Sequence, residues 1–333
     1  MRNIYKYFFY NLVLVIIIFL PLNSFCRSND APKLNVKIHK QISWEEWINQ
    51  IKFELRKKNI NEKTIGLLDQ IKFNSRVIEL DRKQPEFILT FEKYFKNVVN
   101  DKSKIKLNNK YNENKELFLK ISNQYNISSK VLAALWGIES SFGNHVGKLD
   151  ILRSLASLAF DGRRKKFFTK ELENALLILD EGHFNYKTFK GSWAGAFGQT
   201  QFMPSTFLKY AVDFDGDKKK NLFQKHDALA SGANYLRSVG WNNSLPWGQK
   251  VNINITEKIH NLSKEKKFKS FKFWNKIGAN LDSKFKNVDL RIVIPDSKFN
   301  ECYLVSKNFD VILDWNRSNY FALTVFLFSD EIK

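Results

Sequence analysis

One carboxylate inside an apolar helical stretch is the first candidate for chemistry in this chain. Glu139 lies in the run AALWGIESSFG of residues 133–143. At helical spacing it shares a face with Leu132, Leu135 and Trp136, which places it on the buried side of a helix. Burial disfavours the charged form and moves the carboxyl pKa toward the range in which a general acid works. The alternative is a structural ion pair with an Arg or Lys, since such pairs also perturb carboxylates.

The sequence offers few other sites for enzyme chemistry. Its five histidines, at positions 39, 145, 183, 226 and 260, form neither an HExxH motif nor a paired-ligand spacing. It contains no Gly-x-Ser-x-Gly elbow and no dinucleotide fingerprint, and the glycine-rich stretch 191–207 is not followed by the Lys-Ser or Lys-Thr of a phosphate loop. Zinc, acyl-enzyme and redox mechanisms therefore lose support, and we expect that no cofactor is required.

An acidic loop resembles the beginning of a calcium site. Three alternating residues provide oxygens at its first, third and fifth positions, and these are Asp213, Asp215 and Asp217. The loop then departs from the pattern, because Lys218 replaces a glycine and Gln224 replaces the closing glutamate. A Ca²⁺ site would need Asp227 as a further ligand, and the alternative is an Asp-rich turn.

Composition indicates a folded protein and leaves open whether it contacts anionic or sugar surfaces. The 333 residues are 44% hydrophobic and 15% aromatic, which is enough for one large domain or two smaller ones. Thirty Phe and eight Trp would fill a core or line a groove that stacks on sugar rings. The net charge of +20 suits an anionic polymer, although a lysine-rich solvated surface explains it equally well.

The first 26 residues have the pattern of a secretory signal peptide. Basic residues precede an apolar run that ends near Ser24-Phe25-Cys26, so we expect the mature chain to be exported to the periplasm and not to meet nucleic acid. Lipidation at Cys26 is less favoured because Asn23 and Phe25 do not fit that signal. An uncleaved segment would leave the protein associated with the membrane. Cleavage after Cys26 would leave Cys302 as the single thiol, so no internal disulfide is expected.

Periodicity predicts an α+β protein that is mainly α. We expect a flexible leader at 27–42, an N-terminal helical lobe at 43–113 that ends in a polar connector at 101–113, a helical core at 114–245, a small β-containing lobe at 246–314, and a turn and helix at 315–333. Ser43 with Glu46 predicts a capping box, Ser128 or Ser129 should cap the Glu139 helix, and Gly143 should end it. Two prolines, Pro85 and Pro204, should each mark the start of a helix. Strands are predicted at 251–255, 290–294 and 302–305.

Four sequence blocks in the same order resemble the lytic murein transglycosylase B family. They are WGIESSFG at 136–143, the 191–207 block with its core GQTQFMPS, YAVDFDGD at 210–217 and WNRSNY at 315–320. A fifth stretch, DRKQPEF at 81–87, extends the resemblance, which covers the chain from about Ser43 to Phe326. It implies a lysozyme-like helical core whose groove binds the glycan strands of peptidoglycan, with an additional α lobe and a small β lobe, in a protein expected to be monomeric.

The resemblance also implies roles for individual residues. Glu139 occupies the position of the catalytic glutamate, and some members carry a calcium loop where the aspartates of 213–217 lie. The residues at positions implied to contact the glycan are Gln201, Arg163, Arg164, Asn316, Ser140 and Phe202. We further expect the arginines to hold the anionic peptide stems.

The implied reaction cleaves the bond between N-acetylmuramic acid and N-acetylglucosamine without water and leaves a 1,6-anhydro ring. One carboxyl group is enough for this chemistry, because the nucleophile is the muramyl C6 hydroxyl and is already tethered. Ordinary glycosidases use two carboxyl groups. Two alternatives remain open, namely a hydrolytic muramidase with a water-activating base and a non-catalytic module that binds peptidoglycan or another anionic polymer.

Overall fold

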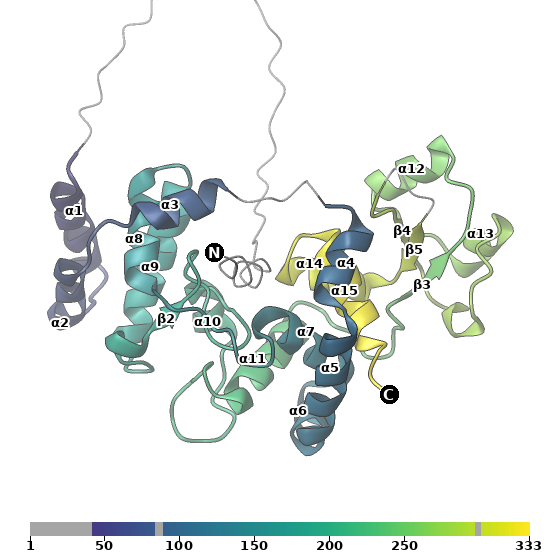
Figure 1. Ribbon diagram of the computed structural model, residues 1–333, viewed down its shortest axis with the longest axis horizontal. Helices are drawn as coiled ribbons and strands as arrows, with labels where there is room; N and C mark the ends of the chain where they lie inside the picture. The colour runs from purple at the N-terminus through teal and green to yellow at the C-terminus, as the bar shows by residue number, and fades with distance from the viewer. Residues whose placement is uncertain (1–41, 84–88, 297–300) are drawn as a thin grey trace, which may run out of the picture.

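The computed structural model describes residues 42–83, 89–296 and 301–333, which form a mainly helical protein with two small antiparallel sheets (Figure 1). The expectation of an α+β, mainly α fold is confirmed. The helices are α1 (Trp44–Arg56), α2 (Glu62–Ile65), α3 (Ser75–Arg82), α4 (Phe91–Val98), α5 (Asp101–Glu113), α6 (Lys115–Tyr125), α7 (Ser129–Ser140), α8 (Ile151–Asp161), α9 (Lys165–Asp180), α10 (Pro204–Tyr210), α11 (Lys225–Ser238), α12 (Glu257–Lys264), α13 (Phe271–Lys276), α14 (Lys307–Trp315) and α15 (Asn319–Ser329). The strands are β1 (Leu149–Asp150), β2 (Lys190–Gly191), β3 (Gly248–Val251), β4 (Arg291–Val293) and β5 (Cys302–Val305), and short 3-10 turns cover Gly66–Gln70, Tyr186–Thr188 and Ser283–Phe285.

Helix α7 lies at the centre of the molecule. It packs against α5, α6, α11 and α15, and nine of its twelve residues are buried. A helix that is apolar on nearly every side is stable only when other elements surround it, and these four helices do so. The residue that the sequence singled out therefore lies on the most enclosed helix of the fold.

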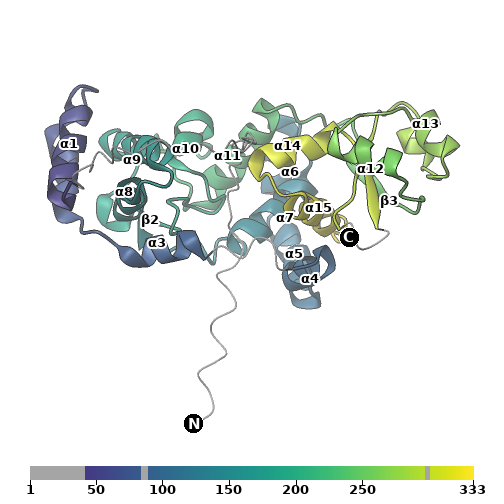
Figure 2. The same ribbon diagram turned by 90° about the horizontal axis from the view of Figure 1, so that it is seen from above.

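The elongated shape in Figure 2 has α7 in the middle, α1 with α8 and α9 at one end, and α12 with α13 at the other. Helices α2 and α3 pack against α9 and α8, whereas α4 and α5 pack against α15 and α7. The segment 43–113, predicted as one lobe, thus contacts two different parts of the molecule. One continuous hydrophobic core joins these helices.

Much of the lobe at 246–314 has a core of its own, whereas α14 packs into the main core. Its sheet has the order β3-β5-β4, with Val251 opposite Cys302 and Val293 opposite Tyr303. Trp274 is fully buried there and donates from Nε1 to the Leu290 carbonyl at 2.9 Å. The predicted strand 251–255 is wrong in its bounds, because β3 ends at Val251, whose partner is the first residue of β5. The lobe also contains α12 and α13, which the sequence did not predict.

The polar stretch 101–113 is a helix, so the prediction of a connector is wrong. Asn100 and Ser103 form a reciprocal capping box, with Ser103 N donating to Asn100 Oδ1 at 3.1 Å and Asn100 N donating to Ser103 Oγ at 2.9 Å. Only Leu107 of α5 is buried. A solvated helix with one inward residue carries almost no hydrophobic period, which is why the pattern failed.

Several local predictions are confirmed. Ser43 and Glu46 form the expected capping box of α1, and Pro204 is the first residue of α10. The predicted signal peptide at 1–26, nearly all of the leader at 27–42, and Pro85 lie outside the described residues. Among the helices that are described, none combines the length and apolar content that a membrane span requires.

Candidate active site

Local sequence fixes where the helix of Glu139 begins and ends. Ser128 caps its start, with the Oγ accepting from Val131 N at 3.3 Å. The helix ends at Ser140, earlier than the predicted stop at Gly143, because Ser141 and Phe142 already adopt left-handed φ values of 50° and 62°. Lys106 of α5 donates to the Ser141 carbonyl at 3.1 Å and secures this turn. Glu139 therefore lies in the last turn of α7.

The Glu139 carboxyl group is enclosed and incompletely hydrogen-bonded. The residue is only 8% exposed; Oε1 accepts a 2.8 Å hydrogen bond from Trp315 Nε1, whereas Oε2 is buried and has no partner among the residues that the structure describes. Burial raises the pKa of Glu139 to about 8, and the Trp315 bond opposes the shift. The negative end of the α7 dipole also disfavours an anion in the last turn. This carboxyl group is therefore protonated near neutral pH.

The ion-pair alternative for Glu139 is wrong within the described residues. No Arg, Lys or His contributes to its pKa shift, and the group that binds it is a neutral indole. A buried acid with an unpartnered oxygen is costly for the fold. It is also a group from which a proton can leave toward a substrate, as general acid catalysis requires.

An aromatic cluster fixes the indole that contacts Glu139. Trp315 ends α14 and packs edge-to-face against Phe202 and Tyr235, at ring-centroid distances of 5.4 and 5.1 Å. The Tyr235 hydroxyl donates to the Asp314 carbonyl at 2.8 Å and holds the end of that helix. Phe202, predicted to contact substrate, is buried, and its ring packs against that of Trp315.

The loop before α10 is joined to the end of α7. Ser140 Oγ donates to the Gln199 carbonyl at 2.7 Å and accepts from Gly143 N at 3.0 Å. Trp136 Nε1 donates to Gln199 Oε1 at 2.8 Å. Ser140 is buried and its hydroxyl is engaged in these bonds, so in this structure it connects the two segments.

Gln201 lies on the same loop in a strained conformation. Its φ is 49°, and its Nε2 donates to the Gly198 carbonyl at 2.7 Å and the Val146 carbonyl at 3.2 Å. Gly198 is required here, because a Cβ at that position would lie 2.4 Å from Leu222 Cβ. Local backbone strain that the surrounding structure maintains is common at functional sites.

Asn316 follows Trp315 directly and begins the turn between α14 and α15. Its Oδ1 accepts from Ser318 N at 3.1 Å, and the residue is mostly buried. The structure therefore brings Glu139, Phe202 and Asn316 together around Trp315.

The two predicted groove arginines converge on one acid. Arg163 Nε donates to Asp81 Oδ2 at 2.8 Å, and Arg164 pairs with Asp81 Oδ1. Asp81 is buried, and the side chain of Arg163 is 50% exposed against 22% for Arg164. Arg163 is thus the more available of the two for an anionic group.

Sequence reasoning missed two residues that interact with Glu139. Trp315 was noted only as part of a block, and its 176-residue separation from Glu139 gives no local pattern. Tyr94 of α4 gives no sequence signal either. Burial raises the pKa of its hydroxyl, and the charge of Glu139 adds to that shift. Only the tertiary structure brings these residues together.

The acidic loop gathers three of its four predicted ligands. Carboxylate oxygens of Asp213, Asp215 and Asp227 lie within 4.8 Å of one another, whereas Asp217 is not in the group. Backbone amides of Gly216 and Lys218 donate to Asp213 at 2.7 and 2.8 Å and orient it. An all-oxygen carboxylate set of this kind fits a hard cation such as Ca²⁺.

Comparison with known proteins gives one consistent match. The family model described as the transglycosylase SLT domain matches residues 43–330. The membrane-bound lytic murein transglycosylase B of Escherichia coli strain K12 is 42% identical over 118 residues, covering 35% of this chain and 33% of that protein. The match therefore spans about a third of this relative's length.

Solved structures extend the likeness over most of the chain. SltB3 from Pseudomonas aeruginosa, in complex with NAG-NAM-pentapeptide, is 33% identical with a TM-score of 0.82, covering 86% of this chain and 79% of that one. The Escherichia coli lytic transglycosylase Slt35, in complex with calcium, is 25% identical with a TM-score of 0.73, covering 85% and 91%.

Proposed function

This chain belongs to the transglycosylase SLT family, and on that basis we propose that it is a peptidoglycan lytic transglycosylase. It cleaves the β-1,4 bond between N-acetylmuramic acid and N-acetylglucosamine without water and forms a 1,6-anhydromuramyl product. The observation that carries this proposal is the buried Glu139 carboxyl group, whose single hydrogen bond comes from Trp315 and whose Oε2 has no partner.

In the first step Glu139 acts as the general acid. With a pKa of about 8 it holds a proton near neutral pH, and it transfers this proton to the glycosidic oxygen as the bond to the muramyl C1 breaks. The N-acetylglucosamine unit leaves with a new hydroxyl group. Positive charge develops at C1, where the muramyl N-acetyl oxygen can stabilise it as in substrate-assisted glycosidases.

In the second step the same residue acts as the base. The Glu139 carboxylate accepts the proton of the muramyl C6 hydroxyl while that oxygen bonds to C1, and the anhydro ring closes with Glu139 protonated again. A tethered nucleophile makes an activated water unnecessary. Trp315 supports this step, because its N–H donates to the carboxylate that exists between the two proton transfers.

Substrate contacts are proposed for three residues of the predicted groove. Arg163 retains half of its side-chain surface while paired with Asp81 and can approach an anionic peptide stem. Gln201 and Asn316 lie on the loop and the turn that adjoin the Trp315 cluster, and we propose that they contact the glycan. Binding to sacculi should weaken with added salt, and a salt-independent affinity would contradict the role of Arg163.

We propose that the acidic loop holds Ca²⁺ through Asp213, Asp215 and Asp227. A bound cation would neutralise their mutual repulsion and stabilise the loop before α11, and it takes no part in proton transfer. Addition of Ca²⁺ should raise the Tm of the wild type but not of Asp227→Asn. An equal response of both proteins would contradict the site.

We also propose that the substrate is met in the periplasm, after export directed by residues 1–26. The sequence pattern of that segment supports export, and a wall-degrading activity requires an envelope location. Fractionation of cells expressing the full chain, with mass analysis of its N-terminus, would test this. A protein found in the cytoplasm with residues 1–26 intact would contradict it.

Digestion of purified sacculi with the wild type and with Glu139→Gln tests the reaction. Mass spectrometry should find muropeptides that end in the anhydro ring, one water lighter than reducing-end products, for the wild type alone. Reducing ends would indicate a hydrolytic muramidase, and solubilisation that survives Glu139→Gln would contradict the mechanism. Binding without cleavage by the wild type would indicate a non-catalytic module.

A further inference from the structure

A carboxylate from the β lobe bonds to two elements that adjoin the Glu139 site. Asp296 follows β4, and its Oδ2 accepts from the backbone amide of Phe91 at 2.6 Å, while its Oδ1 accepts from the Tyr320 hydroxyl. Phe91 is the first residue of α4, and Tyr320 lies in the first turn of α15. One side chain thus joins three segments that are far apart in the sequence.

The two elements held by Asp296 are packed together through aromatic rings. Tyr320 lies 5.4 Å from the ring of Phe91 and 5.7 Å from the ring of Tyr94. Phe91 also packs edge-to-face on Tyr303 of β5 at 6.2 Å. The position of Tyr94 therefore depends on where Tyr320 and the start of α4 lie.

The β lobe also contacts α14, the helix that precedes the turn containing Asn316. Arg291 of β4 is buried and donates from Nε to Asp310 of α14 at 3.0 Å. Trp315 ends α14, and Tyr320 begins α15 after the turn that contains Asn316. The segment from β4 to Asp296 thus contacts both helices that flank this turn.

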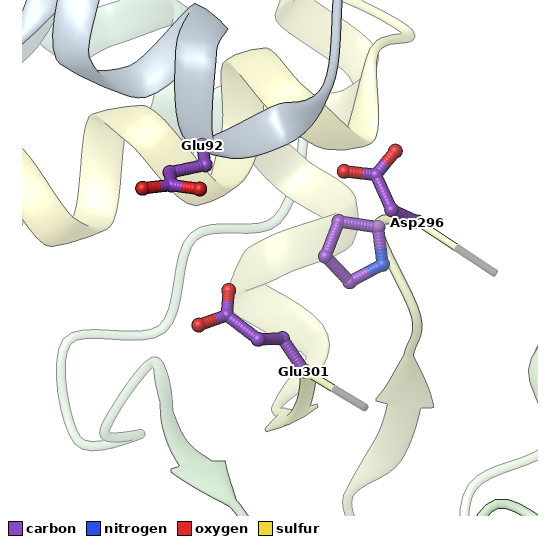
Figure 3. A pocket seen from close by; sticks show the side chains of 4 residues that line it. Glu92, Asp296 and Glu301 are labelled. Carbon is purple, nitrogen blue, oxygen red and sulfur yellow. The ribbon is translucent and has the colours of Figure 1, made fainter. Parts of the chain in front are cut away.

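Figure 3 shows Asp296 beside two other acids that line the same small hollow, Glu92 and Glu301. These two neighbours bond to lysines, Glu92 to Lys96 and Glu301 to Lys250. Among the three, Asp296 is the carboxylate that bonds to both α4 and α15. Glu301 therefore provides a matched control.

We propose that Asp296 is a positioning residue for the Glu139 site: it fixes Tyr320 and the first turn of α4, and through Tyr320 it holds the turn that follows Trp315, whose indole bonds to Glu139. The inference rests on the proposed function. It gives the β lobe a part in catalysis without any contact between Asp296 and the substrate. Burial and, secondarily, Asp296 raise the pKa of Tyr320, so its hydroxyl remains a donor.

The test measures glycosidic bonds cleaved in soluble, uncrosslinked glycan strands, whichever product forms. In Asp296→Ala we expect kcat to fall roughly tenfold with little change in KM, because a small displacement near a reacting group lowers the rate of the chemical step. Tyr320→Phe should show the same split. The double variant should lose no more than Asp296→Ala alone, since Tyr320→Phe breaks one of the two bonds that Asp296→Ala already removes.

Asp296→Asn separates the two bonds. Its amide oxygen can still accept from Tyr320, but its NH₂ group cannot accept from Phe91 N, so kcat should lie between that of the wild type and that of Asp296→Ala. Glu301→Gln should keep the wild-type kcat. Should Asp296→Ala fail to fold, Tyr320→Phe decides, because it retains the ring and its packing.

Hydrogen exchange of residues 91–98 provides a readout that does not depend on activity, and it should be faster in Asp296→Ala. Faster exchange with an unchanged kcat would overturn the proposal, since Asp296 would then be only structural. Wild-type kcat in both single variants, additive losses in the double variant, or an equal loss in Glu301→Gln would also overturn it. The assay counts every cleaved bond, whether the product is an anhydro ring or a reducing end. An error in the proposed product would therefore not change the result for Asp296, and Glu139→Gln, assayed in parallel, tests the proposed catalytic residue separately.

Discussion

Two buried glutamates on separate core helices have different partners. Glu139 of α7 is 8% exposed and receives one hydrogen bond, whereas Glu171 of α9 is 3% exposed and has both oxygens engaged. Ser205 donates to Glu171 from its backbone amide at 2.9 Å and from its hydroxyl at 2.6 Å. Burial raises the pKa of both carboxyl groups, and the donors of each oppose that shift.

The two glutamates differ in whether an oxygen is left to exchange a proton with a substrate. Glu171 stands in for the missing side-chain cap at the start of α10, where Met203 is the N-cap, so its oxygens satisfy backbone groups of the fold. Glu139 has one buried oxygen without a partner among the described residues, as expected of an acid that must give its proton to a substrate. Burial alone therefore does not distinguish the two glutamates, whereas the unpartnered oxygen does.

The largest expected effect is the loss of activity in Glu139→Gln. We expect kcat to fall by at least about 10³-fold, because the amide can neither donate nor accept the transferred proton. Glu171→Gln should keep the wild-type kcat when assayed on the same glycan strands at a temperature where both variants are folded. Equal losses in the two variants would remove the distinction between them.

The second effect is on the pH dependence of stability. Folding raises the pKa of Glu139 from 4.5 to about 8, so the folded state binds its proton more tightly. Its contribution is fully present below about pH 4.5 and is lost as the pH rises through about 8, by roughly 1.4 kcal/mol per pH unit within that window.

Glu171 contributes to stability with the same sign, so the test compares Glu139→Gln with the wild type. The free energy of unfolding in urea, measured between pH 5 and 8, should decline less in the variant. Parallel pH profiles for the two proteins would contradict a raised pKa of Glu139.

A smaller effect is expected from Trp315→Phe, which removes the N–H that donates to Glu139 Oε1 and keeps an aromatic ring at this position. We expect kcat to fall about tenfold, since the carboxylate formed between the two steps loses a charge-assisted hydrogen bond. The alkaline limb of the pH–rate profile should move to higher pH, because that bond lowers the pKa of Glu139. Trp241→Phe is the control, as its Nε1 donates to Asn243 instead.

The smallest effect concerns Glu171 as a structural residue. Glu171→Ala should lower the free energy of unfolding by about 1–3 kcal/mol, because it leaves donors of Ser205 unsatisfied. Ser205→Ala removes only the hydroxyl donor, and its loss should be smaller. Urea unfolding of both variants at one pH checks the order, and a more stable Glu171→Ala would show that Glu171 is not a cap.

Local sequence was sufficient wherever local chemistry decides structure. Caps at Ser43 and Ser128 and the helix start at Pro204 were predicted and are confirmed, because each depends on side chains within a few residues. The same approach failed for α5, where the helix is solvated and its single buried residue, Leu107, leaves no period to detect.

For the candidate site too, the sequence predicted the local feature and the tertiary structure decided the contacts between distant segments. The sequence by itself determined that Glu139 lies on an apolar helix face, since spacing along one helix decides which side chains share a side. Only the tertiary structure decided that Trp315 would bond to one oxygen and that the other would have no partner among the described residues. The Trp315 bond joins α7 to α14, and hydrogen bonds between distant segments depend on how the helices pack, which no local pattern specifies.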